Sequence, residues 1–393
     1  MSKNNENKLV PRLRFPEFND NWNPKQICDL LEYERPDNYI VNDTNYTTEG
    51  TPVLTANKSF ILGYTEETNG ICEDVPAIIF DDFTVDKKFV DFPFKVKSSA
   101  IKILRPKGKD DLKFIFELMS LIKFEAKEHK RYYISAYQNL SIPIPKPNEQ
   151  QKIAACLSSL DDVITAESKK LEVLKEHKKG LLQNLFPQEG ETVPKLRFKE
   201  FENSGEWEET TLTHVADYEN GKAHEQDITD DGDYIVVNSK FISSDGEVKK
   251  FTNTAFCPAQ KGDILMVLSD VPNGKAIAKC FLVEEEDRYT VNQRVCRITP
   301  RNLNSKILYY LLNRNPFFLA FDDGVKQTNL RKEDVLNCPL LIPSDPKEQQ
   351  KVADTLSSID NLINAQSQKI ETLKLHKKGL LQGLFPDVNE HNG

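Results

Sequence analysis

The chain has 393 residues, of which 38% are apolar and 29% are charged, and its formal net charge is −9. This length predicts two or three domains, and the apolar content is too high for a chain that is disordered throughout. The longest uninterrupted apolar run, 264–268, is far too short for a transmembrane helix. The first ten residues contain no apolar signal core, and the seven Cys form no C-x-x-C pair. These features predict a cytoplasmic protein with reduced thiols, without disulfides or a zinc site.

Charge is distributed unevenly along each half of the chain. Residues 29–86 contain two basic and thirteen acidic residues, whereas 87–146 contain fourteen basic and six acidic ones. The second half repeats this trend, with two basic and nine acidic residues in 217–247 and nine basic and two acidic residues in 288–332. A folded chain can gather such basic segments into a local positive field despite its acidic total.

A short internal repeat marks the beginning of each half. Residues 10–18 return as 193–201, with seven of nine positions identical. Each copy is followed by one of the only two Trp residues in the chain, Trp22 and Trp207. The repeat predicts that the chain is built from two copies of one structural plan.

A longer repeat marks the end of each half. Residues 149–187 return as 348–386, at a constant offset of 199 and with 26 of 39 positions identical, whereas the segments 23–147 and 208–346 share little. Similar scaffolds that hold dissimilar modules indicate one function performed on two different targets. The predicted parts are a first variable domain with its N-terminal anchor (1–147), a first long helix (148–187), a linker, anchor and second variable domain (188–346), a second long helix (347–386) and a tail (387–393).

The longer repeat has the apolar spacing of a coiled coil. Its apolar residues alternate three and four positions apart for about five heptads, interrupted by Glu167, Lys178, Gln366 and Lys377. A helix of 35 residues would be about 50 Å long. We expect the two helices to pair with each other, although two separate dimerising helices remain an alternative. The predicted seam consists of Leu157, Leu160, Ile164, Leu171, Leu174 and Leu181, and of Leu356, Ile359, Ile363, Ile370, Leu373 and Leu380.

The variable segments are predicted to mix strands and helices. Strand-like runs are rich in β-branched and aromatic residues, and a helical stretch follows them in each half. The predicted strands are 52–55, 77–80, 100–104, 234–237, 263–268 and 295–298, and the predicted helices lie near 111–128 and 304–320.

The sequence contains no complete catalytic motif. There is no P-loop, no dinucleotide-binding fingerprint and no zinc-ligand cluster. The run Asn315-Pro316-Phe317-Phe318 partly matches an adenine-methyltransferase motif, but we interpret it as a helix cap. Asp233 with Glu247 mimics the carboxylate spacing of metal-dependent nucleases, and the first half has no counterpart. His177 and His376 are expected on helix surfaces.

Basic residues interleaved with polar and aromatic ones predict DNA contacts in both halves. Lys and Arg bind phosphates, and Arg, Asn and Gln can read base edges in the major groove. The alternative for any one of them is a solvated charged loop. The candidates are Lys58, Lys95, Lys97, Lys102, Arg105, Lys130, Arg131, Tyr132, Tyr137 and Gln138 in the first half, and Lys240, Lys275, Arg288, Asn292, Gln293, Arg294, Lys326, Gln327, Thr328, Asn329, Arg331 and Lys332 in the second.

The anchors and the longer repeat resemble the specificity (S) subunit of type I restriction–modification systems. The similar features are the Leu-Arg-Phe-x-x-Phe…Trp openings, the Glu-Gln-Gln-Lys-Ile/Val-Ala-x-x-Leu-Ser-Ser starts and the Lys-Lys-Gly-Leu-Leu-Gln-x-Leu-Phe-Pro ends. The run from Gly324 to Leu330 also resembles the end of a recognition domain in this family. The first half differs there, with Tyr137-Gln138-Asn139-Leu140 and no matching glycine.

The resemblance implies an α+β protein with two mixed α/β target-recognition domains, separated by two long antiparallel helices that form an intramolecular coiled coil with pseudo-twofold symmetry. It implies a non-catalytic subunit in which each domain reads one half of a bipartite, asymmetric site on double-stranded DNA. Its implied partners are two methyltransferase subunits, which use S-adenosylmethionine, and two restriction subunits, which use ATP and Mg²⁺. No cofactor is expected on this chain. A stand-alone nuclease or methyltransferase and a coiled-coil protein scaffold remain alternatives.

Overall fold

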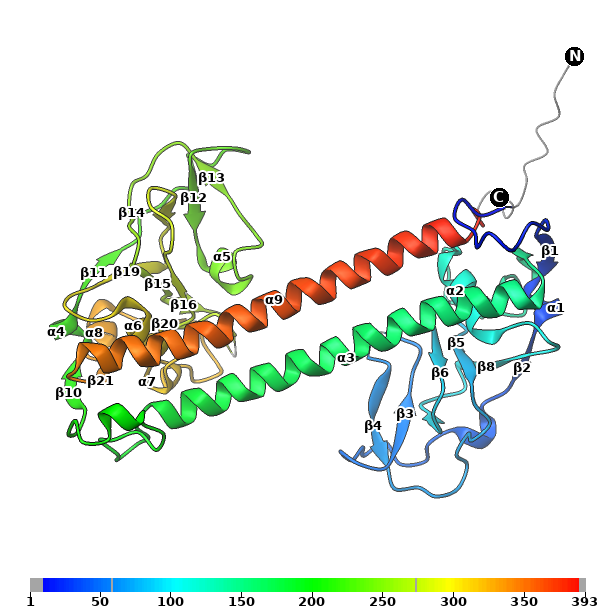
Figure 1. The fold of residues 1–393 in the computed structure, drawn as a ribbon, viewed down its shortest axis with the longest axis horizontal. Helices are drawn as coiled ribbons and strands as arrows, with labels where there is room; N and C mark the ends of the chain where they lie inside the picture. The colour runs from blue at the N-terminus through cyan, green and yellow to red at the C-terminus, as the bar shows by residue number, and fades with distance from the viewer. Residues whose placement is uncertain (1–9, 58, 273, 389–393) are drawn as a thin grey trace, which may run out of the picture. The chain divides into compact units, whose positions relative to one another are not determined.

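The computed structural model describes residues 10–57, 59–272 and 274–388 (Figure 1). The chain divides into two compact units. Unit 1 consists of Met1–Lys169 and Ser367–Gly393, and unit 2 of Lys170–Gln366. Each unit contains one variable segment together with parts of both long helices, so the division runs through the helices and not at their ends.

Unit 1 is built around a four-stranded antiparallel sheet in the order β2-β8-β5-β6. A three-stranded sheet, β4-β3-β7, contains the parallel pair β3·β7, and β1 pairs with β9. The elements are β1 (Asn23–Gln26), α1 (Ile27–Leu30), β2 (Leu31–Glu34), the 3₁₀ helix Asp37–Tyr39, β3 (Thr51–Leu54), β4 (Ile61–Thr65), β5 (Ala77–Asp81), β6 (Lys87–Val90), β7 (Lys95–Val96), β8 (Ile101–Pro106), α2 (Leu112–Leu121), the 3₁₀ helix Tyr137–Asn139 and β9 (Ser141–Ile144).

The central strands of unit 1 are apolar on both faces because both faces are covered. Ile78, Phe80 and Leu104 pack in one core with the apolar face of α2. Ile79 and Ile103 point into a second core, which β3 and β7 help to form. This double burial explains why β5 reads as a continuous apolar run and not as an alternating pattern.

Unit 2 has the same plan, although the sequences of the two variable segments share little. Its main sheet has the order β11-β19-β15-β17, its second sheet is β13-β12-β18-β14 with the parallel pair β12·β18, and β10 pairs with β21. The elements are the 3₁₀ helix Lys199–Phe201, β10 (Glu208–Thr211), α4 (Leu212–Val215), β11 (Ala216–Asn220), β12 (Tyr234–Val237), α5 (Ser239–Ser243), β13 (Phe251–Thr252), β14 (Pro258–Ala259), β15 (Ile264–Val267), β16 (Ser269–Asp270), β17 (Cys280–Leu282), β18 (Tyr289–Val291), β19 (Val295–Pro300), α6 (Ser305–Leu312), α7 (Pro316–Leu319), β20 (Thr328–Asn329), α8 (Lys332–Leu336) and β21 (Pro339–Ile342).

The predicted helix 304–320 is interrupted, and the predicted helix 111–128 is shorter than expected. Pro316 cannot donate the backbone hydrogen bond that would continue α6, so a separate helix, α7, begins there. The Asn315 side chain caps α7 by accepting a hydrogen bond from the Phe317 amide at 2.9 Å, which confirms the capping interpretation. In unit 1, α2 ends at Leu121, and Phe124 packs edge-on against Tyr132 and Tyr137.

The two long helices, α3 (Pro147–Leu185) and α9 (Pro346–Leu384), lie side by side and antiparallel within each unit. In unit 1, Lys377 Nζ lies 2.7 Å from Asp161 Oδ1, and Lys369 Nζ lies 2.5 Å from Glu167 Oε1. In unit 2, Lys178 Nζ lies 2.5 Å from Asp360 Oδ1. The prediction that the helices pair with each other is therefore confirmed within both units.

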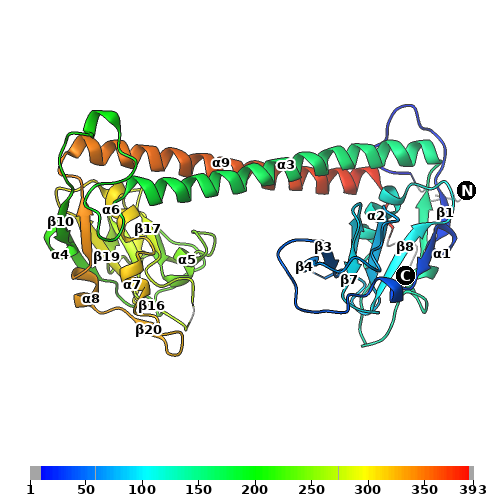
Figure 2. The same ribbon diagram turned by 90° about the horizontal axis from the view of Figure 1, so that it is seen from below.

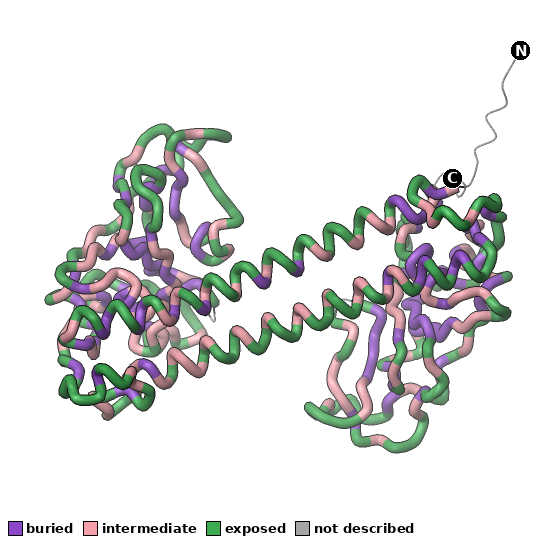
Figure 3. The backbone as a smooth tube through the Cα atoms, viewed as in Figure 1, coloured by how far each residue is buried: buried purple, intermediate pink, exposed green. Residues whose placement is uncertain are grey.

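The predicted seam is the less exposed side of both helices. Leu157 and Leu356, which are equivalent in the repeat, are fully buried. Val163 and Leu362, which lie off the seam, are 44% and 56% exposed. Figure 3 shows this alternation along the two helices. Of the predicted seam residues, Leu157, Leu356, Ile359 and Ile370 are buried, and Leu160, Ile164, Leu171, Leu174, Leu181, Ile363, Leu373 and Leu380 are half-buried.

The two anchors are held by the first turn of a long helix. The Arg14 side chain donates two hydrogen bonds of 2.7 Å to the Glu149 carboxylate, and Trp22 Nε1 donates a third at 3.3 Å. Arg197 donates two bonds of 2.8 Å to Glu348 in unit 2, and Trp207 Nε1 donates one of 3.2 Å. In each unit the short repeat, which forms the anchor, therefore binds the long repeat, which forms the helix.

Candidate nucleic-acid interface

Three segments of unit 1 meet at the end of the central strand β5. The Asp82 amide donates to the Ala100 carbonyl at 2.9 Å, and the Tyr132 amide donates to the Asp82 carbonyl at 2.8 Å. These bonds place the loop after β5, the turn between β7 and β8 and the segment that returns after α2 next to one another. We call this group of residues, 82–86, 97–100 and 128–133, junction 1.

Junction 1 carries aromatic and cationic side chains. The rings of Phe83 and His129 are stacked, with centroids 4.7 Å apart and planes 12° from parallel. The Arg131 guanidinium lies 5.8 Å from the centroid of the Phe83 ring. Lys97, Lys130 and Arg131 are exposed, and the Lys130 ammonium pairs with Glu128 at 2.8 Å. The junction therefore presents cations next to an aromatic stack, a combination suited to nucleic acid.

Unit 2 contains the same junction at the end of β15. The Leu268 amide donates to the Arg294 carbonyl at 2.8 Å, and the Leu330 amide donates to the Leu268 carbonyl at 2.8 Å. We call residues 268–272, 274–277, 292–294 and 324–332 junction 2. Its short antiparallel ribbon, β16·β20, lies on the side of unit 2 that faces away from the long helices (Figure 2).

Junction 2 is organised by polar side chains. Asp270 Oδ2 accepts hydrogen bonds from the amides of Ala276 at 2.6 Å and Ile277 at 3.1 Å, which shapes the loop after β16. Gln327 Nε2 donates to Ser269 Oγ at 2.7 Å, across the ribbon. The exposed candidates at this junction are Lys275, Gln293, Arg294, Lys326, Gln327, Asn329, Arg331 and Lys332. Asn292 is half-buried, and both it and Gln293 donate to Glu225 Oε1.

The structure shows which segment of unit 1 corresponds to residues 327–330 of unit 2, and this segment is not the one that the sequence resemblance suggested. Tyr132 occupies the position of Leu330, because each donates the same bond to the residue after the central strand. Leu140 occupies the position of Cys338, because their carbonyls accept from Ile27 and Leu212 respectively, at the start of equivalent helices. The run 137–140 is therefore not the counterpart of 327–330, whose place in unit 1 is taken by 129–132.

Two of the predicted lysines are buried inside unit 1. Lys95 is 1% exposed, and its ammonium donates to the Asn69 carbonyl at 2.6 Å and pairs with Glu67 at 2.8 Å. Hydrogen bonds from the Lys95 ammonium and from the backbone amides of Asp43 and Asn42 together lower the pKa of Glu67 to about 2. Lys102 is 3% exposed and lies 3.6 Å from the Asp82 carboxylate. We therefore withdraw both from the predicted DNA surface, because a cation sealed inside the fold cannot reach a phosphate.

Other candidates also serve the fold. Tyr132 and Tyr137 are buried in the core of unit 1, and Thr328 is buried with its hydroxyl bonded to Asp322 at 3.2 Å. Arg105 is half-buried and bonds Glu34 and the Cys72 sulfur at 3.3 Å each. The predicted DNA contacts of Tyr132, Tyr137 and Thr328 are wrong, because these side chains are buried. The contact of the half-buried Arg105 stays a prediction.

The remaining candidates lie outside the two junctions. Gln138 is half-buried and bonds the Ile134 carbonyl at 3.0 Å. Lys240 is exposed on α5, and Arg288 is exposed and pairs with Glu285 at 3.2 Å. Lys58 falls outside the described residues.

Sequence reasoning missed three residues at the junctions: Phe83, His129 and Ser269. Phe83 carried a weak signal, since it is an aromatic residue two positions after the buried strand β5. His129 adjoins the basic run that was identified, and its importance comes only from its contact with a residue 46 positions away. No sequence pattern indicated that Ser269 would hold Gln327.

The structure also bears on the alternative catalytic readings. Asp233 and Glu247 are both exposed, and among residues 10–57, 59–272 and 274–388 no group of three or more His, Cys, Asp or Glu side chains could hold a metal ion.

His177 and His376 are exposed on the long helices, as predicted, and all seven cysteines are free. No helix in the described part of the chain combines the length and apolarity needed to cross a membrane.

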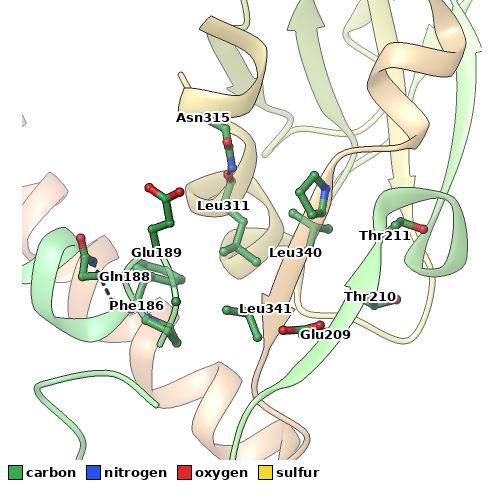
Figure 4. Close-up of a pocket in the computed structure, with 13 residues that line it drawn as sticks. Phe186, Gln188, Glu189, Glu209, Thr210, Thr211, Leu311, Asn315, Leu340 and Leu341 are labelled. Carbon is green, nitrogen blue, oxygen red and sulfur yellow. Dashed lines mark hydrogen bonds between the residues drawn. The ribbon is translucent and has the colours of Figure 1, made fainter. Parts of the chain in front are cut away.

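A surface pocket of about 590 Å³ lies in unit 2, where the chain leaves α3 (Figure 4). Phe186, Leu311, Leu340 and Leu341 line it, with the Glu189 carboxylate beside them. In unit 1, Val388 occupies the repeat position of Glu189 and is 1% exposed within the core. The pocket is thus a place where an apolar residue completes the core in one unit and a carboxylate replaces it in the other, and it is separate from junction 2.

A family model and related proteins both match this chain, and they indicate the same family. The family described as the type I restriction modification DNA specificity domain matches residues 19–176 and 204–375. The EcoR124I/EcoR124II specificity subunit of Escherichia coli is 29% identical over 366 residues, which cover 88% of this chain and 87% of that protein. The MjaVIII specificity subunit of Methanocaldococcus jannaschii is 26% identical, covering 96% and 94% of the two chains.

A solved structure of the S subunit of a type I restriction–modification system from M. genitalium has a similar fold. Its TM-score is 0.66 at 16% identity, and the match covers 96% of this chain and 99% of that one. The two family matches each contain one variable segment and most of one long helix, so they follow the internal repeat. The chain therefore belongs to the family of type I restriction–modification specificity subunits.

Proposed function

We propose that this chain is a non-catalytic DNA reader in which junction 1 and junction 2 each recognise one half of a bipartite, asymmetric site. The observation that carries the proposal is the pair of junctions itself. Three segments are joined by the same two hydrogen bonds in each unit, yet the side chains they present differ. One scaffold with two different sets of base-reading groups suits two half-sites of different sequence.

The side chains at both junctions suit duplex DNA. Exposed lysines and arginines can contact phosphates, whereas Arg, Asn and Gln can form paired hydrogen bonds with base edges. A two-stranded β-ribbon such as β16·β20 also fits the width of the major groove. The acidic total of the chain does not oppose this proposal, because binding depends on the local field at the contact surface.

The proposed partners follow from the family to which the chain belongs. We propose that it joins two methyltransferase subunits, which use S-adenosylmethionine, and two restriction subunits, which use ATP and Mg²⁺. The proposed complex acts in the cytoplasm, and no cofactor is assigned to this chain. Its own contribution is to place the partners on a chosen sequence.

The decisive experiment exchanges one variable segment and leaves both long helices intact. Residues 23–146 would be replaced by the corresponding segment of another family member, and the methylated sequence would be determined in cells that also produce the partner subunits. We expect one half of the methylated sequence to change and the other half to stay. A change in both halves, or no methylated sequence at all, would contradict the proposal.

Two further assays separate this proposal from the alternatives. The purified chain supplied with Mg²⁺ or S-adenosylmethionine should neither cut nor methylate DNA, whereas a nuclease that uses Asp233 and Glu247 would cut and would lose this activity in Glu247→Ala. A coiled-coil scaffold would show no preference among DNA sequences. Binding by the proposed reader should be sequence-specific and should weaken steeply with salt.

A further inference from the structure

We infer that Arg131 reads a guanine in the half-site recognised by unit 1, and that Phe83 and His129 position it for this task. The inference rests on the proposed function and assigns one base contact within it. Arg131 is exposed in the segment that follows α2. The next residue is Tyr132, whose amide donates a hydrogen bond to the carbonyl of Asp82.

The surroundings of Arg131 hold its side chain without neutralising it. Among the described residues Arg131 forms no salt bridge, whereas its neighbour Lys130 pairs with Glu128 at 2.8 Å. The guanidinium lies 5.8 Å from the centroid of the Phe83 ring, and the His129 ring is stacked on the same Phe83 ring with the centroids 4.7 Å apart. An aromatic ring under a guanidinium limits its orientations and leaves its edge N–H groups available.

The backbone below Arg131 is also fixed. Asp82 Oδ1 accepts the Tyr133 amide at 2.8 Å, and the buried Lys102 ammonium lies 3.6 Å from the other oxygen of this carboxylate. Asp82 and Lys102 are both nearly inaccessible to solvent. The backbone that carries Arg131 is therefore held rigidly at the end of β5. A side chain that reads a DNA base requires such a rigid support.

The corresponding position in unit 2 carries a different base-reading group. The residue before Leu330 is Asn329, which is exposed, and Gln327 lies beside it with its amide held by Ser269. Arginine pairs best with the O6 and N7 acceptors of guanine, whereas amide side chains match adenine. Arg131 and Asn329 thus occupy equivalent positions but match different bases. Such a difference is expected at a position that determines which DNA sequence each unit recognises.

The test uses selection of duplexes from a randomised DNA library by the full-length chain, followed by sequencing. The wild-type chain should select a bipartite sequence with a guanine in one half. In Arg131→Ala and Arg131→Lys the preference for that guanine should fall about tenfold or more, while the other half-site stays unchanged. The lysine variant is decisive, because it keeps the charge but loses the planar fork.

Two companion variants complete the design. Phe83→Leu should weaken the preference at the same base pair, and by less than Arg131→Ala, because it releases the arginine but does not remove it. Arg301→Ala, in unit 2 and outside both junctions, is the matched control: Arg301 is exposed but paired with Asp217 at 3.4 Å, and its removal should leave the preferences for both half-sites unchanged.

The outcomes separate this inference from the proposed function. If Arg131→Lys selects the same sequence as the wild-type chain, and Arg131→Ala loses affinity equally for all sequences, Arg131 contacts a phosphate and the inference is overturned while the function stands. If the wild-type chain selects no bipartite sequence, the proposed function fails and the inference fails with it.

Discussion

Arg14 and Glu149 are 135 positions apart in the sequence, and two hydrogen bonds of 2.7 Å join them at the start of α3. The Glu149 side chain is 2% exposed and that of Arg14 is 13% exposed, so the pair is largely shielded from water. Its repeat counterpart, Arg197 with Glu348, is formed in the same way and at almost the same distances. The anchors thus connect the extended start of each half to the helix at its end.

Removing one member of this pair should destabilise unit 1 more than unit 2. Arg14→Ala leaves the Glu149 carboxylate buried with only the Trp22 indole as a side-chain donor, and we expect a loss of about 3 kcal/mol, the lower limit for a broken buried pair. Hydrogen exchange of the unit 1 amides measures this loss. Lys152→Ala, which removes the nearby exposed pair with Glu17, is the control and should have a much smaller effect. Equal effects of the two variants would contradict this view of the anchor.

Stability of unit 1 should depend on pH through Asp161. Burial acts to raise the pKa of Asp161, but hydrogen bonds from Lys377 and Lys113 outweigh it, and the pKa lies below its ordinary value of 3.8. A lowered carboxylate pKa in the folded state gives stability that is present above the unfolded-state value and is lost as pH falls through the folded-state value. Asp161→Asn should therefore destabilise unit 1 at neutral pH, and its difference from the wild-type chain should shrink below about pH 4.

The matched control for this titration is Asp162→Asn, on the same helix. Asp162 is exposed and forms no salt bridge with a described residue. Denaturant unfolding between pH 3 and pH 7 is the measurement. A pH profile of Asp161→Asn that runs parallel to that of the wild-type chain over this whole range would show that the Lys377–Asp161 pair does not supply the stability.

The buried seam should be far more sensitive to truncation than the outer face of the same helix. Leu157 is fully buried against both α9 and the core of unit 1, so Leu157→Ala should cost about 2–5 kcal/mol. Val163→Ala, at a position that is 44% exposed, should change stability by less than about 1 kcal/mol. Thermal or denaturant unfolding of the two variants checks this, and similar losses would mean that the seam is assigned to the wrong face.

Phosphate contacts at junction 2 should be visible in the salt dependence of DNA binding. Lys326 is exposed in the loop before β20, so Lys326→Ala should weaken binding to all sequences to a similar extent and reduce the slope of log K against log salt by about 1. Lys374→Ala is the control, because Lys374 lies exposed on α9 and pairs with Glu371. Binding titrations at several salt concentrations measure both slopes, and an unchanged slope for Lys326→Ala would remove this residue from the interface.

Much of the fold could be predicted because it depends on local sequence patterns that occur twice in the chain. The apolar spacing of the long helices specified the seam, and the strands β5, β12 and β15 were recognisable as buried apolar runs. Repetition helped further, since Lys178 and Lys377 interrupt both copies of the seam and proved to be paired with equivalent aspartates. The break between α6 and α7 was missed, although Pro316 gave a physical reason for it.

The candidate site was predicted less well, because charge in a sequence does not reveal whether a side chain is exposed. Lys95, Lys102 and Arg105 look like Lys130 and Arg131 in the sequence. In the structure Lys95 and Lys102 are buried in ion pairs and Arg105 is half-buried and paired, whereas Lys130 and Arg131 are exposed. The difference depends on partners such as Glu67, Asp82 and Glu34, which lie 20 to 71 positions away in the chain.

The sequence by itself determined that the chain is a duplicated scaffold with two long helices and two diverged segments, because periodicity and repetition depend only on the order of residues. The tertiary structure alone decided that the diverged segments share one topology, and that Tyr132 corresponds to Leu330. It also decided which polar residues gather at the two junctions. The reason is physical: a strand pairing or a junction is made by hydrogen bonds between residues far apart in the chain, and many different side chains can lie on the same set of backbone bonds.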